Sequence, residues 1–429
     1  MSYLVAKRNR VTKFFMTQTQ KEAPSFNQLG IIPNILSVLA VRKFFVPTPI
    51  QHQCIPAAIE GKDVVGIAQT GTGKTLAFGI PMIQRLAREH GQGLVLLPTR
   101  ELALQVDEVL KKLCNPLGMR TGVVIGGANM GQQVRMLRDR PHIVVATPGR
   151  LIDHILGKTY NLSNIKMIVL DEADRMLDIG FMPQIRQILS TAPVNRQTMM
   201  FSATMPSAIS ELAARYMKMP LRIEVAPSGT PAKNVEQEVY IVNKENKAQL
   251  LEKLLIDNPG TVLVFSRTKF GAKKITASLN SIGHRAVEIH SNRSLAQRKA
   301  AMEGFRSGRY RILVATDIAA RGIDVVGISL VINYDLPDNL DDYVHRIGRT
   351  GRAGMFGKAV SFAAPDERGS VKQIERLIRR TLPILGLPVL PPRREPIKIA
   401  VSDDQRQRRG FNPHKRRPEK RFVPRRRNW

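Results

Sequence analysis

The sequence has few cysteines, a deficit of acidic residues and no long hydrophobic run. Its only two cysteines, Cys54 and Cys114, are too few for a disulfide framework and are typical of a reducing compartment. No apolar run approaches the length of a transmembrane helix, so we expect no membrane span. Asp and Glu total 35 against 66 Lys and Arg, which gives a formal net charge of +31. This imbalance favours a polyanionic partner, with nucleic acid ahead of a membrane surface.

The two ends of the chain differ from its middle. Residues 1–21 contain no Asp or Glu, as in some organelle-targeting peptides, but they lack the apolar core of a secretory signal. We therefore expect residues 1–23 to form a disordered basic arm. Residues 393–429 carry fourteen Lys or Arg against four Asp or Glu, a net charge of +10, and residues 386–429 are predicted to be a disordered tail. The tail either serves solubility or binds phosphates, and aromatic residues between its arginines favour phosphate binding with base stacking.

The middle of the chain alternates short apolar runs with longer amphipathic stretches. Strands are predicted at 64–68, 94–97, 121–125, 143–146, 165–170 and 198–201, and again at 235–242, 261–265, 285–289, 312–315 and 330–334. This alternation predicts an α/β protein with two parallel sheets, in domains over 24–225 and 235–385 joined by a linker at 226–234. Ligands of such sheets bind beyond the carboxyl ends of the strands.

A phosphate-binding loop follows the first predicted strand. The segment AQTGTGKT at 68–75 lies between that strand and a helical pattern, and it differs from the general P-loop in starting with Ala68 instead of Gly. Its glycines let backbone N–H groups face a phosphate, Lys74 supplies a charge, and the hydroxyl of Thr75 is a ligand for Mg²⁺. The predicted ATP-binding residues of this loop are Ala68, Gln69, Thr70, Gly71, Thr72, Gly73, Lys74 and Thr75.

Three carboxylates follow the apolar run at 165–170. In P-loop enzymes a second strand end holds the Mg²⁺ that bridges the β- and γ-phosphates, and Asp171 has this position, with contact to the ion through water. Glu172 is then placed to orient or deprotonate the attacking water. Acidic residues here would also suit the start of a helix and its dipole, but that explanation leaves their pairing with a P-loop unexplained.

Seven motifs in order make the sequence similar to the DEAD-box RNA helicases, over residues 26–362. They are AQTGTGKT, PTRELA at 98–103, TPGR at 147–150, DEAD at 171–174, SAT at 202–204, ARGID at 320–324 and HRIGRTGR at 345–352. The resemblance implies two tandem RecA-like domains, and the short extensions are most similar to bacterial RhlE-like members.

The resemblance also implies roles around ATP. Gln51 of PTPIQ would read adenine, with Phe44 nearby, although Lys43 stands where the family usually has Gly. Core packing is the alternative for Phe44 and for Phe26. Further residues would act from the other domain or link the two ligand sites: Asp324 at the ribose, Arg349 and Arg352 as arginine fingers, and Asp174, Ser202, Thr204 and His345 in coupling.

RNA contacts are implied at phosphates and sugars, so sequence would be read weakly. The residues are Arg100, Gly127, Thr147, Arg150, Thr316 and Gly322. Where the family often has Gln-x-x-Arg, this chain has Leu295 and Arg298, which keeps the arginine and loses the glutamine.

Taken together, the sequence predicts an ATP- and Mg²⁺-dependent RNA helicase with RNA-stimulated ATP hydrolysis. We expect a cytoplasmic monomer with RNA as partner, the ribosome or the RNA-degradation machinery as candidate further partners, and no membrane association. The alternatives are a non-hydrolysing RNA clamp of the same fold and a DNA translocase. Intact Glu172, Arg349 and Arg352 argue against the clamp, and the combination of Gln51 with DEAD argues against the translocase.

Overall fold

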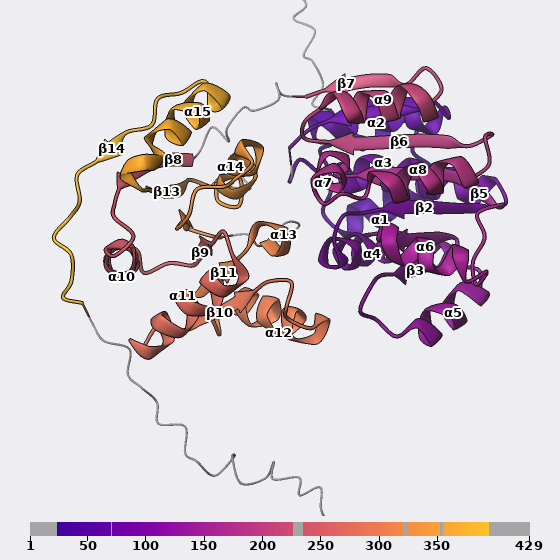
Figure 1. Cartoon of the computed structure of the whole chain (residues 1–429). Helices are drawn as coiled ribbons and strands as arrows, with labels where there is room; N and C mark the ends of the chain where they lie inside the picture. Colours follow the sequence, from indigo (N-terminus) through magenta and orange to yellow (C-terminus); the bar gives the residue numbers. More distant parts are fainter. Residues whose placement is uncertain are drawn as a thin grey trace, which may run out of the picture.

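The structure is a computed structural model that describes residues 24–69, 71–225, 235–320, 325, 327–351 and 355–393. The predicted basic arm at 1–23, the linker at 226–234 and the tail from 394 onward lie outside the described residues. Figure 1 shows two α/β units, the first coloured indigo to magenta and the second orange to yellow. Over the described part of the chain, no helix combines the length and apolarity needed to cross a bilayer.

Each unit contains a parallel sheet of seven strands, and the two sheets have the same topology. The strand orders are β3-β4-β2-β5-β6-β1-β7 and β10-β11-β9-β12-β13-β8-β14, which become identical when seven is subtracted from each number of the second. The first sheet comprises β1 (Val64–Ile67), β2 (Gln92–Leu96), β3 (Thr121–Val124), β4 (Ile143–Ala146), β5 (Ile165–Asp171), β6 (Gln197–Ser202) and β7 (Leu221–Glu224). The second comprises β8 (Val235–Ile241), β9 (Val262–Phe265), β10 (Ala286–Ile289), β11 (Ile312–Ala315), β12 (Leu330–Asn333), β13 (Gly357–Ala363) and β14 (Ile384–Leu385).

Helices cover both faces of the first sheet, because its central strands are apolar on both sides. One core cluster packs under α1 (Pro33–Val41), α2 (Pro49–Ile59), α3 (Lys74–Arg88) and α4 (Arg100–Cys114). The other packs under α5 (Met130–Arg138), α6 (Pro148–Leu156), α7 (Ala173–Asp178), α8 (Met182–Thr191) and α9 (Ser207–Tyr216).

The second sheet is covered in the same way. One face packs against α10 (Lys247–Asp257) and α11 (Lys269–Ser281). The other packs against α12 (Leu295–Arg306), α13 (Asp317–Ala320), α14 (Leu340–Ile347) and α15 (Arg368–Ile378). Short 3₁₀ helices lie at Phe26–Gln28, Asn115–Leu117 and Pro365–Glu367.

The predicted fold class is confirmed, and every predicted strand overlaps an observed one. The sequence analysis missed β7, β13 and β14. Two of these are edge strands: β7 buries only Ile223, and β14 has two residues, so neither shows a strong apolar pattern. β13 is largely buried, but its sequence GKAVSFA consists mostly of small residues.

The start of the predicted tail lies against the second unit. Leu390 packs on the cluster under α10 and α11, and Gln249 Nε2 donates to the carbonyl oxygen of Pro391 at 2.7 Å. The chain therefore still contacts the domain several residues beyond the predicted boundary at 385.

Candidate active site and nucleic-acid interface

The P-loop joins the end of β1 to the start of α3. Gly71 and Gly73 both have a φ of 87°, a left-handed conformation that glycine adopts without strain. A Cβ at Gly73 would lie 2.3 Å from Gln51 Nε2, so the close approach also requires glycine there. The buried Lys74 ammonium donates to the carbonyl oxygen of Ala68 at 3.0 Å, and the Thr72 hydroxyl donates to that of Gln69 at 2.7 Å. The loop thus holds a cation at a helix start, where the first N–H groups have no intrahelical partner, and this arrangement binds phosphate.

Gln51 connects the start of α2 to this loop. Its Oε1 accepts from the backbone N–H of Thr48 at 2.9 Å, and its Nε2 donates to the carbonyl oxygen of Gly73 at 3.0 Å. A primary amide has two hydrogens and two lone pairs, so each atom keeps one further bonding position. The buried Gln51 is therefore fixed in orientation and still able to bond the edge of a base.

The end of α1 positions Phe44. Phe44 N–H donates to the carbonyl oxygen of Leu39 at 2.9 Å, and Lys43 N–H donates to that of Ala40 at 2.9 Å, which together form a Schellman motif. Lys43 has the left-handed φ of 61° that this motif needs, which explains the usual Gly at this position. Phe44 is 44% exposed and available for stacking. Phe26 is buried in the core, which agrees with core packing, the alternative considered for this residue.

The three carboxylates lie at the end of β5 and the start of α7. Asp171 Oδ1 accepts from the N–H of Glu172 at 3.0 Å. Glu172 precedes the helix with a φ of 55°, a conformation that costs a non-glycine residue roughly 1–2 kcal/mol. Its Oε2 is 2.6 Å from Nη1 of Arg175, and both side chains are buried. Arg175 thereby holds the Glu172 carboxylate in a fixed position, a role that the sequence analysis did not predict.

Asp171 has a perturbed pKa. Burial raises the pKa of its carboxyl from 3.8 to about 6, and the ammonium of Lys74 acts in the opposite direction. The negative charge of Glu172 raises the pKa further. The effect of the Lys74 ammonium on Asp171 and the pairing of β1 and β5 with β6 place the strand end and the P-loop close together.

Asp174 is bonded to the segment after β6. Its Oδ2 accepts from the N–H groups of Ala203 and Thr204 at 3.0 and 2.8 Å and from the Thr204 hydroxyl at 3.0 Å. The Ser202 hydroxyl accepts from the N–H of Asp174 at 3.1 Å. The hydroxyls of Ser202 and Thr204 therefore both bond to Asp174, and these bonds tie the start of α7 to the end of β6.

The four candidate RNA residues of the first domain gather beyond β2, β3 and β4. A Cβ at Gly127, whose φ is 76°, would lie 2.3 Å from Nη1 of Arg100, so this glycine makes room for the guanidinium. Arg150 Nη1 donates to the carbonyl oxygen of Ala128 at 3.1 Å, and Thr147 precedes α6. The group combines two cations with exposed backbone, as a phosphate chain requires.

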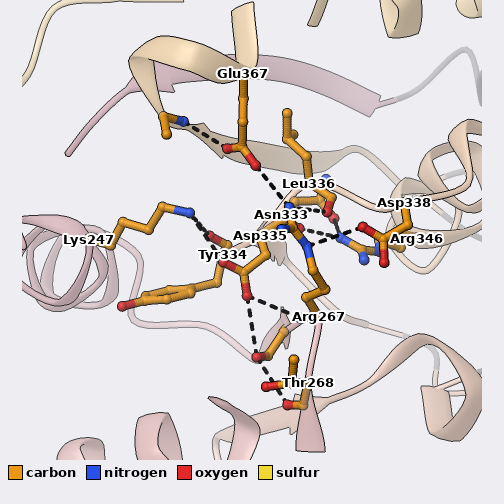
Figure 2. A network of polar contacts seen from close by, with 12 residues as sticks. Lys247, Arg267, Thr268, Asn333, Tyr334, Asp335, Leu336, Asp338, Arg346 and Glu367 are labelled. Atoms are coloured by element: carbon orange, nitrogen blue, oxygen red, sulfur yellow. Dashed lines mark hydrogen bonds and ion pairs between the residues drawn. The ribbon is translucent and has the colours of Figure 1, made fainter. Parts of the chain in front are cut away.

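A buried network fixes α14 in the second domain (Figure 2). Arg346 is 1% exposed and donates to both carboxylate oxygens of Asp317 at 2.6 and 2.7 Å. It also donates to Asn333 Oδ1 at 3.3 Å and to the carbonyl oxygen of Asp335 at 2.6 Å. The Asp335 carboxylate in turn pairs with Lys247 at 3.2 Å. Arg346 and Asp317, which were not predicted as site residues, therefore join α14 to α13 and to the end of β12.

Arg349 lies two residues past the end of α14, within the second domain. Its Nε donates to the carbonyl oxygen of His345 at 3.2 Å, and the side chain is buried. Both residues border a small cavity with Asp317, Asp342 and Arg346. Thr316 lies at the end of β11, where its carbonyl oxygen accepts from the N–H groups of Ala319 and Ala320. Four predicted site residues lie outside the described residues: Thr70, Gly322, Asp324 and Arg352.

The two domains touch through α12 and α4. Arg298 Nη2 is 2.9 Å from Glu101 Oε2, and both side chains are 10% exposed. Leu295, which replaces the usual glutamine, packs against the core cluster of the first domain. An apolar contact thus stands where the family often has a polar one.

The features of the P-loop and the end of β5 suit a nucleoside triphosphate better than other ligands. The site combines the ammonium of Lys74, two left-handed glycines and the buried carboxylate of Asp171 at the end of β5. These groups match a polyphosphate with a divalent cation. A second carboxylate held by a buried arginine can orient water.

Comparison with known proteins agrees with this geometry. Residues 48–212 match the DEAD/DEAH box helicase family, and residues 246–354 match the helicase conserved C-terminal domain. The chain is 42% identical over 369 residues to the DEAD-box ATP-dependent RNA helicase CshA of Bacillus cereus (strain ATCC 10987 / NRS 248), covering 85% of this chain and 70% of CshA. CshA of Geobacillus kaustophilus (strain HTA426) is also 42% identical, over 85% of this chain and 79% of that protein.

Solved structures show the same architecture. S. cerevisiae Dbp5 bound to RNA and ADP BeF3 matches with a TM-score of 0.78 and 29% identity, over 85% of this chain and 96% of that one. Mss116p bound to ssRNA and AMP-PNP also has a TM-score of 0.78, with 27% identity over 85% and 79% of the two chains. With its two RecA-like domains, its motifs in order and these relatives, the chain belongs to the DEAD-box ATP-dependent RNA helicases.

Proposed function

We propose that this RNA helicase binds ATP through the P-loop and Gln51 and hydrolyses it only when both domains meet. The convergence of Lys74 and Asp171 carries the proposal, because it places a cation and a carboxylate where the phosphates would bind. The Gln51 amide would use its remaining lone pair and N–H to accept from and donate to the edge of adenine. Phe44 would stack near the base. Asp324 would contact the ribose. Binding of the phosphates requires Lys74 to exchange its bond with Ala68 for phosphate oxygens.

Asp171 and Thr75 would hold Mg²⁺. A carboxylate and a hydroxyl are oxygen ligands that suit this ion, and the buried Asp171 is a carboxylate whose ionisation a cation would favour. When bound, Mg²⁺ supplies neutralisation of charge on the β- and γ-phosphates.

Glu172 would position the attacking water and accept its proton. Its contact with the buried Arg175 fixes the direction of the carboxylate. Arg349 and Arg352 would stabilise the charge that develops on the phosphoryl oxygens. Arg349 must turn from its position beside His345 to do this, so hydrolysis would depend on a rearrangement in the second domain.

RNA would lie across both domains. Arg100, Gly127, Thr147 and Arg150 would hold it on the first domain, and Thr316 and Gly322 on the second. Asp174, Ser202, Thr204 and His345 would couple this binding to the ATP site, since the bonds of Asp174 tie the catalytic strand end to the segment after β6. Closure on a bent strand would separate short duplexes locally.

Several finer assignments are part of this proposal. We infer the RhlE-like subtype from the resemblance of the sequence, and we infer a cytoplasmic monomer. The domain limits of 24–225 and 235–385, and a ribosome or RNA-degradation partner, are also proposals.

ATPase rates measured with no nucleic acid, with single-stranded RNA and with single-stranded DNA test the function. The proposal predicts stimulation by RNA and little by DNA, because the expected contacts include the 2′-OH. Equal stimulation by both polymers would favour the DNA translocase, and the absence of hydrolysis under all three conditions would favour the clamp.

A further inference from the structure

A cavity of about 540 Å³ lies on the second domain, along the edge strand β10. It is bordered by Thr276 and Asn280 of α11 on one side and by the turn between α12 and β11 on the other. None of the helicase motifs contributes to its lining. Its size is within the range that accommodates small ligands, roughly 300–1,000 Å³.

Arginines gather at this cavity. Arg285 and Arg309 line it with exposed side chains. Arg311 lies beside them, and the pKa of its guanidinium is lowered by burial and by the like charge of Arg285. Among the described lining residues, Glu288 is the one carboxylate, and it is already paired with Arg293. The cavity therefore carries uncompensated positive charge, which favours an anionic ligand.

An aromatic ring completes the lining. Tyr310 is half-buried, and a Cβ at Gly304 would lie 2.6 Å from its ring, so α12 supports the ring on one side. The Arg309 guanidinium lies 5.6 Å from the ring centroid. Aromatic rings combined with arginines are typical of surfaces on which nucleic-acid bases stack beside their phosphates.

Two further observations bear on the kind of ligand that the cavity can hold. Thr276 lines the cavity, and its hydroxyl oxygen is buried with no hydrogen-bond partner among the described residues. The side chain of Asn280 bonds both the N–H and the carbonyl oxygen of Ala286, at 2.9 and 3.1 Å. These bonds occupy the edge of β10 at this residue and disfavour the addition of a peptide strand there.

The edge strand β10, which borders the cavity, ends beside Thr316, a candidate RNA residue. The carbonyl oxygen of Ile289, at the end of β10, accepts from the N–H of Thr316 at 3.4 Å. A strand of four residues spans about 13 Å, so a chain that passes Thr316 needs only this distance to reach Arg285.

We propose that this cavity binds a nucleotide unit of single-stranded RNA outside the helicase core, with the base on Tyr310 and the phosphate between Arg285 and Arg309. It would retain the single-stranded extension of an RNA whose other part lies across the two domains. The inference rests on RNA binding by the helicase and on the proposed contact of RNA with Thr316.

The test uses the full chain with Mg²⁺ and AMP-PNP. Affinity is measured by fluorescence anisotropy for a short RNA that spans only the helicase motifs and for one with single-stranded extensions on both sides. Arg309→Glu is compared with Arg376→Glu, which changes an exposed arginine of α15 near the opposite edge of the sheet by the same charge. Relative to this control, Arg309→Glu should lower affinity for the extended RNA by about tenfold and leave the short RNA unchanged.

Variants of Tyr310 separate stacking from charge. Tyr310→Trp should retain affinity for the extended RNA, whereas Tyr310→Ala should lose it to a similar degree as Arg309→Glu. RNA-stimulated ATPase with the short RNA should stay at the parental rate in all variants, which distinguishes failure of this site from failure of the helicase core. If Tyr310→Ala unfolds the domain, the comparison of Arg309→Glu with Arg376→Glu still decides.

Equal affinities of Arg309→Glu and Arg376→Glu for the extended RNA would overturn the proposal. Titration with AMP, with AMP-PNP filling the ATP site, distinguishes a free nucleotide from an RNA strand. AMP binding that requires Arg309, without any difference in RNA affinity, would also overturn the assignment to RNA.

Discussion

At the scale of the residue, buried charges determine what the ATP site can do. Glu172 and Arg175 form an ion pair in which both side chains are buried, and Asp171 lies next to them. The motif DEAD predicted which carboxylates would matter. The sequence did not predict Arg175 as the partner of Glu172 or Arg346 as the partner of Asp317, because the partner of a buried arginine depends on tertiary packing. For Arg346 the partner Asp317 is 29 positions away in the sequence.

Glu172→Gln should abolish most turnover and preserve binding. The amide keeps the shape of the side chain but cannot accept a proton from water, and a general base typically contributes about 10²–10⁴ in rate. RNA-stimulated phosphate release and equilibrium ATP binding measure the two properties. A variant that hydrolyses ATP near the parental rate would remove Glu172 from the mechanism.

Asp171→Asn should alter how stability depends on pH. The folded pKa of Asp171 is about 6, above its ordinary value of 3.8, so its contribution to stability is present at low pH and lost as pH rises through 6. Without Mg²⁺ and nucleotide, the variant should therefore be more stable than the parent at pH 8, by on the order of 3 kcal/mol, and equal to it near pH 4. Urea unfolding at both pH values measures this, and a difference that does not change with pH would contradict the raised pKa.

At the scale of the element, strand ends and helix starts bring the site together. The order of strands in the first sheet places the ends of β5, β6 and β1 side by side, so that the P-loop, Asp171 and Ser202 meet. The sequence predicted these strands because their apolar runs are bounded by turn residues. It could not predict β7 and β14, since short edge strands gain little from burial and form mainly through pairing with β1 and β8.

Lys43→Gly should stabilise the end of α1. Lys43 adopts a left-handed φ of 61° in the Schellman motif, and glycine relieves this strain at some cost in unfolded-chain entropy. We expect a gain of about 0.5–1 kcal/mol in the free energy of unfolding of the first domain.

The neighbouring substitution Arg42→Gly provides the control. Arg42 has an ordinary φ of −91°, so glycine there should destabilise. Urea unfolding followed by circular dichroism measures both variants, and opposite signs are expected. Destabilisation by Lys43→Gly would show that the left-handed conformation carries no strain.

At the scale of the whole molecule, the helicase consists of two domains with the same sheet topology. The residues at the strand ends of the two domains differ in their chemistry. The first unit carries the proposed nucleotide site, and the second carries Arg349, two residues past the end of α14. The contact of Glu101 with Arg298 joins α4 to α12, close to the candidate RNA residue Arg100. The sequence predicted two domains, but the interdomain role of Leu295 required the structure because a change from a polar to an apolar residue does not reveal its partner.

A double-mutant cycle on Glu101 and Arg298 should show coupling. Either Glu101→Gln or Arg298→Gln leaves one buried charge without its partner, so RNA-stimulated ATPase should fall in each. The double variant should lose less than the sum of the single losses, with an interaction energy of about 0.5–3 kcal/mol. Additive losses would show that the ion pair does not contribute to the active arrangement of the domains.

The central claim is that ATP hydrolysis needs an arginine from the second domain at a site built by the first. It is tested most directly with Arg349→Ala in the full chain, by measuring RNA-stimulated ATPase and ATP affinity in the same preparation, with Arg376→Ala as control. We predict that the rate falls by about a thousandfold or more while ATP affinity stays close to that of the parent, because the arginine acts on the transition state. Hydrolysis at the parental rate in Arg349→Ala would contradict the two-domain active site.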